Sequence, residues 1–213
     1  MEIDIINFVF GIIASLIATI IVSSLRNQSI RFLRFKAIKS LSNDEIAFKG
    51  DNLDSISKLL MNSIHNSQEL RVYSNRGNFL TNDRGTLNAV LSENNLQSIR
   101  CLLAGESDFL EERAAEYCKL NNGYEVKNYL EDVARSIEIL TKLSKENERL
   151  QIREHIQPIT FRFILTNNHL FISYFERNKP AKETEVLVYA NNAKTYHGFD
   201  RYFETVWRNS NKK

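Results

Sequence analysis

The stretch T-F-R-F-I-L-T-N, residues 160–167, has the pattern of a buried strand, except that an arginine, Arg162, stands in its middle. Two more strand-like stretches follow it. A turn at Asn167 and Asn168 leads to H-L-F-I-S-Y-F, and E-V-L-V-Y-A comes after that. Arg162 is therefore either a residue on the solvent face of a strand or part of a binding site.

Helix and strand patterns alternate on both sides of these three strands. Strand patterns also occupy residues 69–74 and 98–105, and helical spacing occupies residues 53–64, 86–92, 109–120, a longer segment from Val126, and 196–208. From residue 69 onward the order is β-α-β-α-α-β-β-β-α. This order predicts an α/β domain with a mixed sheet.

The composition is that of a folded protein without a conventional catalytic motif. Only two prolines and seven glycines occur in 213 residues, which leaves little material for flexible linkers. The two cysteines lack metal-ligand spacing, the four histidines are scattered, and no glycine-rich phosphate loop or G-x-S-x-G motif is present. We therefore predict no metal, no cofactor and no catalytic residue.

The strand order, and the amphipathic helix that follows three clustered strands, resemble one half of the phospholipase D superfamily. That family carries His-x-Lys-x4-Asp on a strand in this position, and here the pattern falls on Thr160, Arg162 and Asn167. The resemblance covers roughly residues 50–210. It implies a phospholipase D-like half domain that has lost its histidine nucleophile, because no nearby base activates the Thr160 hydroxyl. Arginine in place of lysine keeps the positive charge and adds a planar fork suited to phosphate.

The resemblance further implies phosphate recognition without cleavage. Arg162, Asn167 and His169 would hold a phosphodiester together with Asn75 and Arg76, which lie in the loop after the first strand. Tyr196 and His197, at the start of the last helix, could stack on a base. Each of these residues also has an ordinary alternative, such as a hairpin turn for Asn167 or a helix cap for Tyr196 and His197.

The N-terminal run I-I-N-F-V-F-G-I-I-A-S-L-I-A-T-I-I-V-S-S-L, residues 5–25, contains no charge. As a helix it would rise about 31 Å, enough to cross a hydrocarbon core of roughly 30 Å. The alternative is a buried core helix. We expect a single transmembrane helix over residues 1–25, a basic juxtamembrane segment over residues 26–50 and a cytoplasmic ligand-sensing domain over residues 51–213.

Positive charge directly follows this run, whereas no Lys or Arg precedes it. The positive-inside rule therefore places the N-terminus outside and the C-terminal domain in the cytoplasm, in a bacterial inner membrane. The following basic residues would meet anionic lipid headgroups: Arg26, Arg31, Arg34, Lys36 and Lys39.

Small or polar residues recur at every fourth position of the predicted membrane helix. Such a stripe is either a helix-packing seam in an anchor or the lining of a narrow pore formed by several copies of the chain. The stripe consists of Asn7, Gly11, Ser15, Thr19 and Ser23.

A short membrane helix joined to a small sensor resembles the membrane effectors of bacterial antiphage systems, including cyclic-oligonucleotide-triggered, CRISPR-associated and DNA-oligomer-gated (Hailong) types. The first hypothesis is therefore a homo-oligomer of three or more subunits, an ion channel gated by a nucleotide or oligonucleotide. The second is a membrane-tethered phospholipase D-like phosphodiesterase or nuclease. The third is a non-catalytic membrane scaffold.

Overall fold

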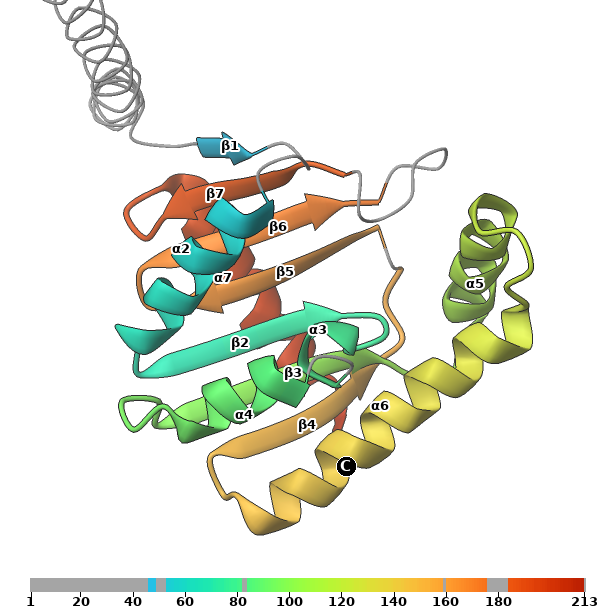
Figure 1. The fold of residues 1–213 in the computed structure, drawn as a ribbon, viewed down its shortest axis with the longest axis horizontal. Helices are drawn as coiled ribbons and strands as arrows, with labels where there is room; N and C mark the ends of the chain where they lie inside the picture. The colour runs from blue at the N-terminus through green and yellow to red at the C-terminus, as the bar shows by residue number, and fades with distance from the viewer. Residues whose placement is uncertain (1–45, 49–52, 82–83, 159, 176–183, 213) are drawn as a thin grey trace, which may run out of the picture. The chain divides into compact units, whose positions relative to one another are not determined.

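The computed structural model describes residues 46–48, 53–81, 84–158, 160–175 and 184–212, which all belong to one compact unit of the chain, residues 44–213 (Figure 1). The predicted transmembrane helix, its polar stripe and the five basic residues that follow it lie outside the described residues. None of the described helices is both long and apolar enough to cross a membrane.

One mixed sheet of eight strands organises these residues, in the order β1-β7-β6-β5-β2-β3-β4-β8. Strands β2, β3 and β4 run parallel to one another, and every other neighbouring pair is antiparallel. The strands are β1 Ile46–Phe48, β2 Glu69–Ser74, β3 Ser98–Ala104, β4 Leu150–His155, β5 Phe161–Thr166, β6 His169–Tyr174, β7 Val186–Ala190 and β8 Asn211–Lys212.

Helices cover both faces of this sheet, so the domain has three layers (Figure 1). Helices α2, α4 and α6 lie on one face, α7 lies on the other, and α5 packs on α6 beyond the end of the sheet. The helices are α2 Leu53–His65, α3 Asn78–Thr81, α4 Arg84–Ser92, α5 Asp108–Leu120, α6 Val126–Glu146 and α7 Lys194–Arg208.

Alternation along the strands builds a separate core on each face. In β2, Leu70 and Val72 pack under α2 and α4, whereas Tyr73 faces α7. In β5, Phe163 and Leu165 face α7 as well and are almost fully buried. Central strands of an α/β sheet are covered on both faces, which is why these segments are so apolar.

The predicted α/β class and mixed sheet are confirmed, including the strand that carries Arg162. The sequence patterns missed β4, whose second half is charged (R-E-H) and so hides the alternation of Leu150 and Ile152. They also missed the short edge strands β1 and β8. Because β1 pairs with β7, the sheet takes in residues of the segment predicted as juxtamembrane, residues 26–50.

Candidate functional site

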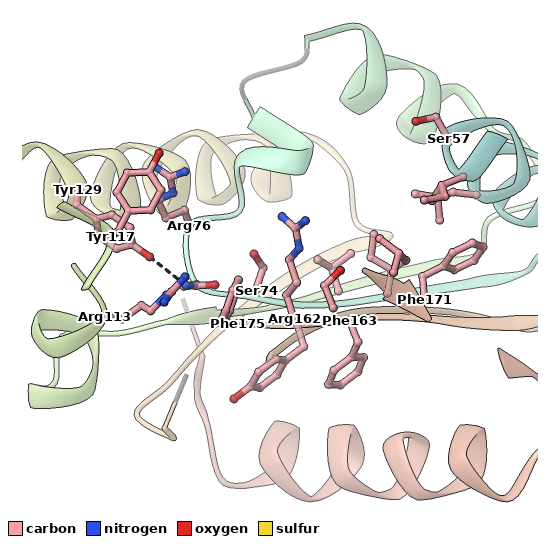
Figure 2. Close-up of a pocket in the computed structure, with 18 residues that line it drawn as sticks. Ser57, Ser74, Arg76, Arg113, Tyr117, Tyr129, Arg162, Phe163, Phe171 and Phe175 are labelled. Atoms are coloured by element: carbon pink, nitrogen blue, oxygen red, sulfur yellow. Dashed lines mark hydrogen bonds between the residues drawn. The ribbon is translucent and has the colours of Figure 1, made fainter. Parts of the chain in front are cut away.

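A pocket of about 250 Å³ opens above β2, β5 and β6, on the face of the sheet that α2 covers. Its walls come from α2, from the loop after β2, from α5 and α6, and from the ends of β5 and β6. Figure 2 shows Arg162 rising from its strand into this space, with Arg76, Tyr117 and Tyr129 to one side and Ser57 and Phe171 to the other. Among the described residues, the lining contains three arginines but no histidine and no carboxylate.

Arg162 owes its position to the register of β5. It lies opposite Ser173 of β6 in an antiparallel pair, and the side chains of such a pair point to the same face, so both line the pocket. Within the described part of the chain, the Arg162 guanidinium forms no hydrogen bond and no ion pair. Its side chain is exposed at the pocket, yet surrounding protein lowers its pKa by desolvation, and the nearby charges of Arg76 and Arg113 lower it further.

The loop after β2 presents Arg76 to the pocket. Gly77, at φ 67°, turns the chain in the left-handed region, and its N–H donates to the Ser74 hydroxyl at 3.4 Å. The Arg76 guanidinium then lies 4.5 Å from the ring centre of Tyr117 and 5.0 Å from that of Tyr129. The same guanidinium forms an ion pair with the Asp132 carboxylate at 3.6 Å.

Arg113 enters the pocket from α5 and is only 4% exposed. Its guanidinium carbon lies 4.2 Å from the ring centre of Phe175, and one terminal nitrogen pairs with Glu116 at 3.1 Å. Its Nε is buried and has no hydrogen-bond partner among the residues that the structure describes. A buried donor without a partner is unfavourable, so an added acceptor in the pocket would stabilise this side chain.

The structure brings together three of the eight predicted ligand residues: Asn75, Arg76 and Arg162 all line the pocket. Asn75 is buried, and its side-chain amide donates to the Tyr129 hydroxyl at 2.9 Å. Thr160 is exposed just before β5 begins and is absent from the lining.

The other four predicted residues gather near the opposite end of β5, roughly 16 Å along the strand from Arg162. Asn167 closes the β5–β6 turn, and its Oδ1 accepts from the backbone N–H groups of Gln68 (2.7 Å) and Glu69 (2.9 Å). Two hydrogen bonds tie this end of the sheet to α2 and α7: Ser63 Oγ to His169 Nδ1 at 2.9 Å, and the Tyr196 hydroxyl to the Thr166 carbonyl at 2.7 Å. The exposed His197 contacts only the ring of its neighbour Tyr196, edge-on, among the ring contacts of the described residues. These contacts hold the fold at a distance from the pocket.

Sequence reasoning missed the pocket residues that come from α5, α6 and the end of β6. The useful signal was Arg113, a basic residue between Leu110 and Ala114 on the apolar side of a helix. The missed aromatic residues have no such signal, because tyrosines at helical spacing usually belong to the core. They are Tyr117, Tyr129 and Phe175.

Comparison with known proteins gives a fold but no close relative. No protein-family model matches the sequence, and no curated protein matches it either. NucT from Helicobacter pylori is similar over 79% of this chain and 98% of its own, with 13% identity and a TM-score of 0.50. A phosphatidylserine synthase from Haemophilus influenzae Rd KW20 is similar over 79% of this chain and 39% of its own, with 11% identity and a TM-score of 0.51.

A looser match is Nuc from Salmonella typhimurium, a phospholipase D family member, with 11% identity, a TM-score of 0.42, and coverage of 79% of this chain and 98% of its own. This chain therefore shares a fold with NucT and with the synthase. At these identities the likeness concerns the fold alone.

Proposed function

We propose that the pocket binds the phosphate of a nucleotide or short oligonucleotide without cleaving it. The observation that carries the proposal is the convergence of three guanidinium groups, from Arg76, Arg113 and Arg162, on one cavity. Guanidinium groups form bidentate, charge-assisted hydrogen bonds to phosphate oxygens, which are stronger than hydrogen bonds between neutral groups. Asp132 and Glu116 partly offset Arg76 and Arg113, which leaves Arg162 as the arginine of the pocket with no carboxylate beside it in the described residues.

Among the described residues, the pocket lining holds no histidine and no carboxylate that could activate a serine hydroxyl, and this supports binding rather than hydrolysis. Phospholipase D chemistry uses a histidine, and the matching position here is Thr160, outside the lining. His169 and His197 lie toward the other end of β5, so neither is placed to attack a phosphorus atom held by Arg162. Attack needs the reacting atoms about 3 to 3.5 Å apart.

Binding and hydrolysis can be tested on the same full-length protein. We would measure binding of short DNA and RNA oligonucleotides by calorimetry, and cleavage of bis(p-nitrophenyl) phosphate by absorbance. Replacement of Arg162 by Gln should weaken oligonucleotide binding about tenfold or more, because it removes a charge-assisted contact. The matched control is Arg135→Gln, which changes an exposed arginine of α6 away from the pocket lining. Binding that survives Arg162→Gln, or diester cleavage by the unmodified protein, would overturn the proposal.

The same proposal gives this domain the role of a sensor in a single-pass membrane effector, a homo-oligomeric channel of bacterial antiphage defence. The charge-free run over residues 5–25, with basic residues after it, supports this role. A ligand changes such a channel only if it binds the open and closed states with different affinity. Dye release from liposomes that contain the protein, with and without oligonucleotide, tests it. If the protein inserts into the liposomes but releases no dye in either condition, the proposed channel function is wrong.

A further inference from the structure

The pocket has two chemically different ends, and Arg162 stands between them. One end is cationic and aromatic, with Arg76 on Tyr117 and Tyr129 and with Arg113 on Phe175. The other end, called the aliphatic end below, is lined by one phenyl ring and five aliphatic side chains: Phe171, Ile56, Leu60, Val72, Ile164 and Val186. Figure 2 shows Arg76 and Arg113 on one side of the cavity, Arg162 in the middle and Phe171 on the other side. A ligand that fills the whole pocket must therefore combine an anionic group with an apolar one.

Two hydroxyl groups accompany the aliphatic end. Ser57 projects from the exposed side of α2, and Ser173 lies on β6 directly opposite Arg162. An apolar wall with a small number of polar groups is the usual surface for a flat, partly polar ring, since the wall takes the ring face and the hydroxyls bond to its edge. A nucleobase has this character. A plain inorganic anion would leave this end of the pocket empty.

The volume limits how much of a nucleic acid can enter. Pockets that enclose a drug-sized ligand usually measure about 300 to 1,000 Å³, and this pocket measures about 250 Å³. It therefore has room for no more than about one nucleotide. A phosphodiester in the middle of a strand carries a nucleoside on both sides of phosphorus, whereas a terminal phosphate carries one.

The arrangement of donors also favours a terminal phosphate. The three arginines come from the loop after β2, from α5 and from β5, so their guanidinium groups approach the cavity from different elements. A phosphate monoester offers three terminal oxygens with a charge of about −1.5 to −2 at pH 7. A diester offers two such oxygens and a single negative charge. A monoester therefore has one terminal oxygen for each of the three arginines, whereas a diester has one too few.

We infer that the pocket recognises the phosphorylated end of a nucleotide or oligonucleotide, with a terminal phosphate monoester among Arg76, Arg113 and Arg162 and the attached nucleobase against the aliphatic wall. This inference rests on the proposed phosphate-binding function and specifies its ligand. The rest of the oligonucleotide extends out of the pocket.

Matched ligands separate this inference from the proposed function. The probes are a DNA tetranucleotide with a 5′-phosphate, the same tetranucleotide with a 3′-phosphate, and the tetranucleotide without a terminal phosphate, each titrated into the full-length protein. One phosphorylated form should bind about tenfold or more tightly than the unphosphorylated form, and AMP should compete better than 3′,5′-cyclic AMP. Equal binding of all three tetranucleotides would overturn the inference and leave the proposed function standing. Binding of none of them would overturn both.

Two variants and one lipid test the placement of the ligand. Arg162→Gln should abolish the preference for the phosphorylated end, whereas Arg135→Gln should keep it. Ser57→Trp fills the aliphatic end from an exposed position. It should therefore weaken the binding of AMP by about tenfold and change the affinity for inorganic phosphate by less than about twofold. Equal losses for both ligands would contradict the placement of the base. Dioctanoyl phosphatidic acid carries the same phosphate on a lipid, and binding of it in preference to every nucleotide would overturn the nucleotide assignment.

Discussion

The side-chain amide of Asn75 donates a 2.9 Å hydrogen bond to the hydroxyl of Tyr129, and this bond joins the loop after β2 to helix α6. Both residues are buried, at 6% and 1% exposure. Arg76 follows Asn75 and lies on the same Tyr129 ring, so one contact positions both the loop and its cation. The bond therefore links the stability of the domain to the geometry of the pocket.

Loss of this hydrogen bond should destabilise the domain. Tyr129→Phe keeps the ring under Arg76 but leaves the buried Asn75 amide without its acceptor, so we expect a loss of about 1 to 3 kcal/mol in the free energy of unfolding. Urea denaturation measures it. Tyr174→Phe is the control, because Tyr174 is largely exposed. The prediction is wrong if the two variants are equally stable.

His155 makes the domain sensitive to acid. It is 4% exposed at the end of β4, its ring stacks on Tyr73 with centroids 4.4 Å apart, and its Nδ1 accepts from the Gln157 N–H at 3.2 Å. Burial lowers its pKa from 6.5 to about 4. Between these two values the unfolded chain binds a proton that the folded chain does not, so stability falls as the pH falls through this window.

The expected loss from His155 is roughly 2 to 3 kcal/mol between pH 7.5 and about pH 4.5. Burial raises the pKa of Glu204, but the hydrogen bond to Arg100 and the charges of nearby arginines outweigh it and lower the pKa overall, so the contribution of Glu204 disappears mainly below this range. Urea denaturation of the unmodified protein and of His155→Gln across this range isolates the histidine. The variant should lose less stability on acidification. Parallel curves for the two proteins would show that His155 does not titrate as its burial requires.

The sequence predicted the fold better than it predicted the site, and particular residues show why. Strand patterns such as that of β5 depend on local alternation, which a single chain displays directly, so the sheet was largely foreseeable. The charged half of β4 could not be foreseen in this way. Its Arg153 donates to the Trp207 carbonyl at 2.5 Å, and no local sequence pattern reveals such a tertiary contact. Position along the strand decides which predicted ligand residues reach the pocket. Arg162 lies near the start of β5 and lines the pocket, whereas Asn167 follows the end of the same strand and does not.

Arg149 holds the end of α4 and the loop that follows it. Its guanidinium donates to three backbone carbonyls, those of Leu91 (2.6 Å), Glu93 (3.0 Å) and Leu96 (3.0 Å). Arg149→Lys keeps the charge but removes the fork, so it should destabilise the domain by about 1 to 3 kcal/mol. Thermal unfolding checks this, with Arg135→Lys as control. A melting temperature that matches the control would mean that the three bonds contribute little.

Gly77 and Gly123 provide a matched pair that separates backbone strain from loss of the pocket. Both have positive φ, 67° and 82°, a conformation that costs alanine about 1 kcal/mol. Among the described residues, a Cβ on Gly123 would meet nothing within 4 Å, whereas a Cβ on Gly77 would lie 3.2 Å from a methyl carbon of Leu103 in the core. Gly77→Ala should therefore destabilise the domain more than Gly123→Ala.

The pair also reports on ligand binding. Because Gly77 directly follows Arg76, movement of this loop would draw the guanidinium away from Tyr117 and Tyr129. Gly77→Ala should thus weaken oligonucleotide binding about tenfold, and Gly123→Ala should not change it, when both are measured by calorimetry well below their melting temperatures. If both alanine variants bind like the unmodified protein although Gly77→Ala is the less stable, the position of Arg76 is not what the ligand requires. In that case Arg113 and Arg162 alone would carry the contact with phosphate.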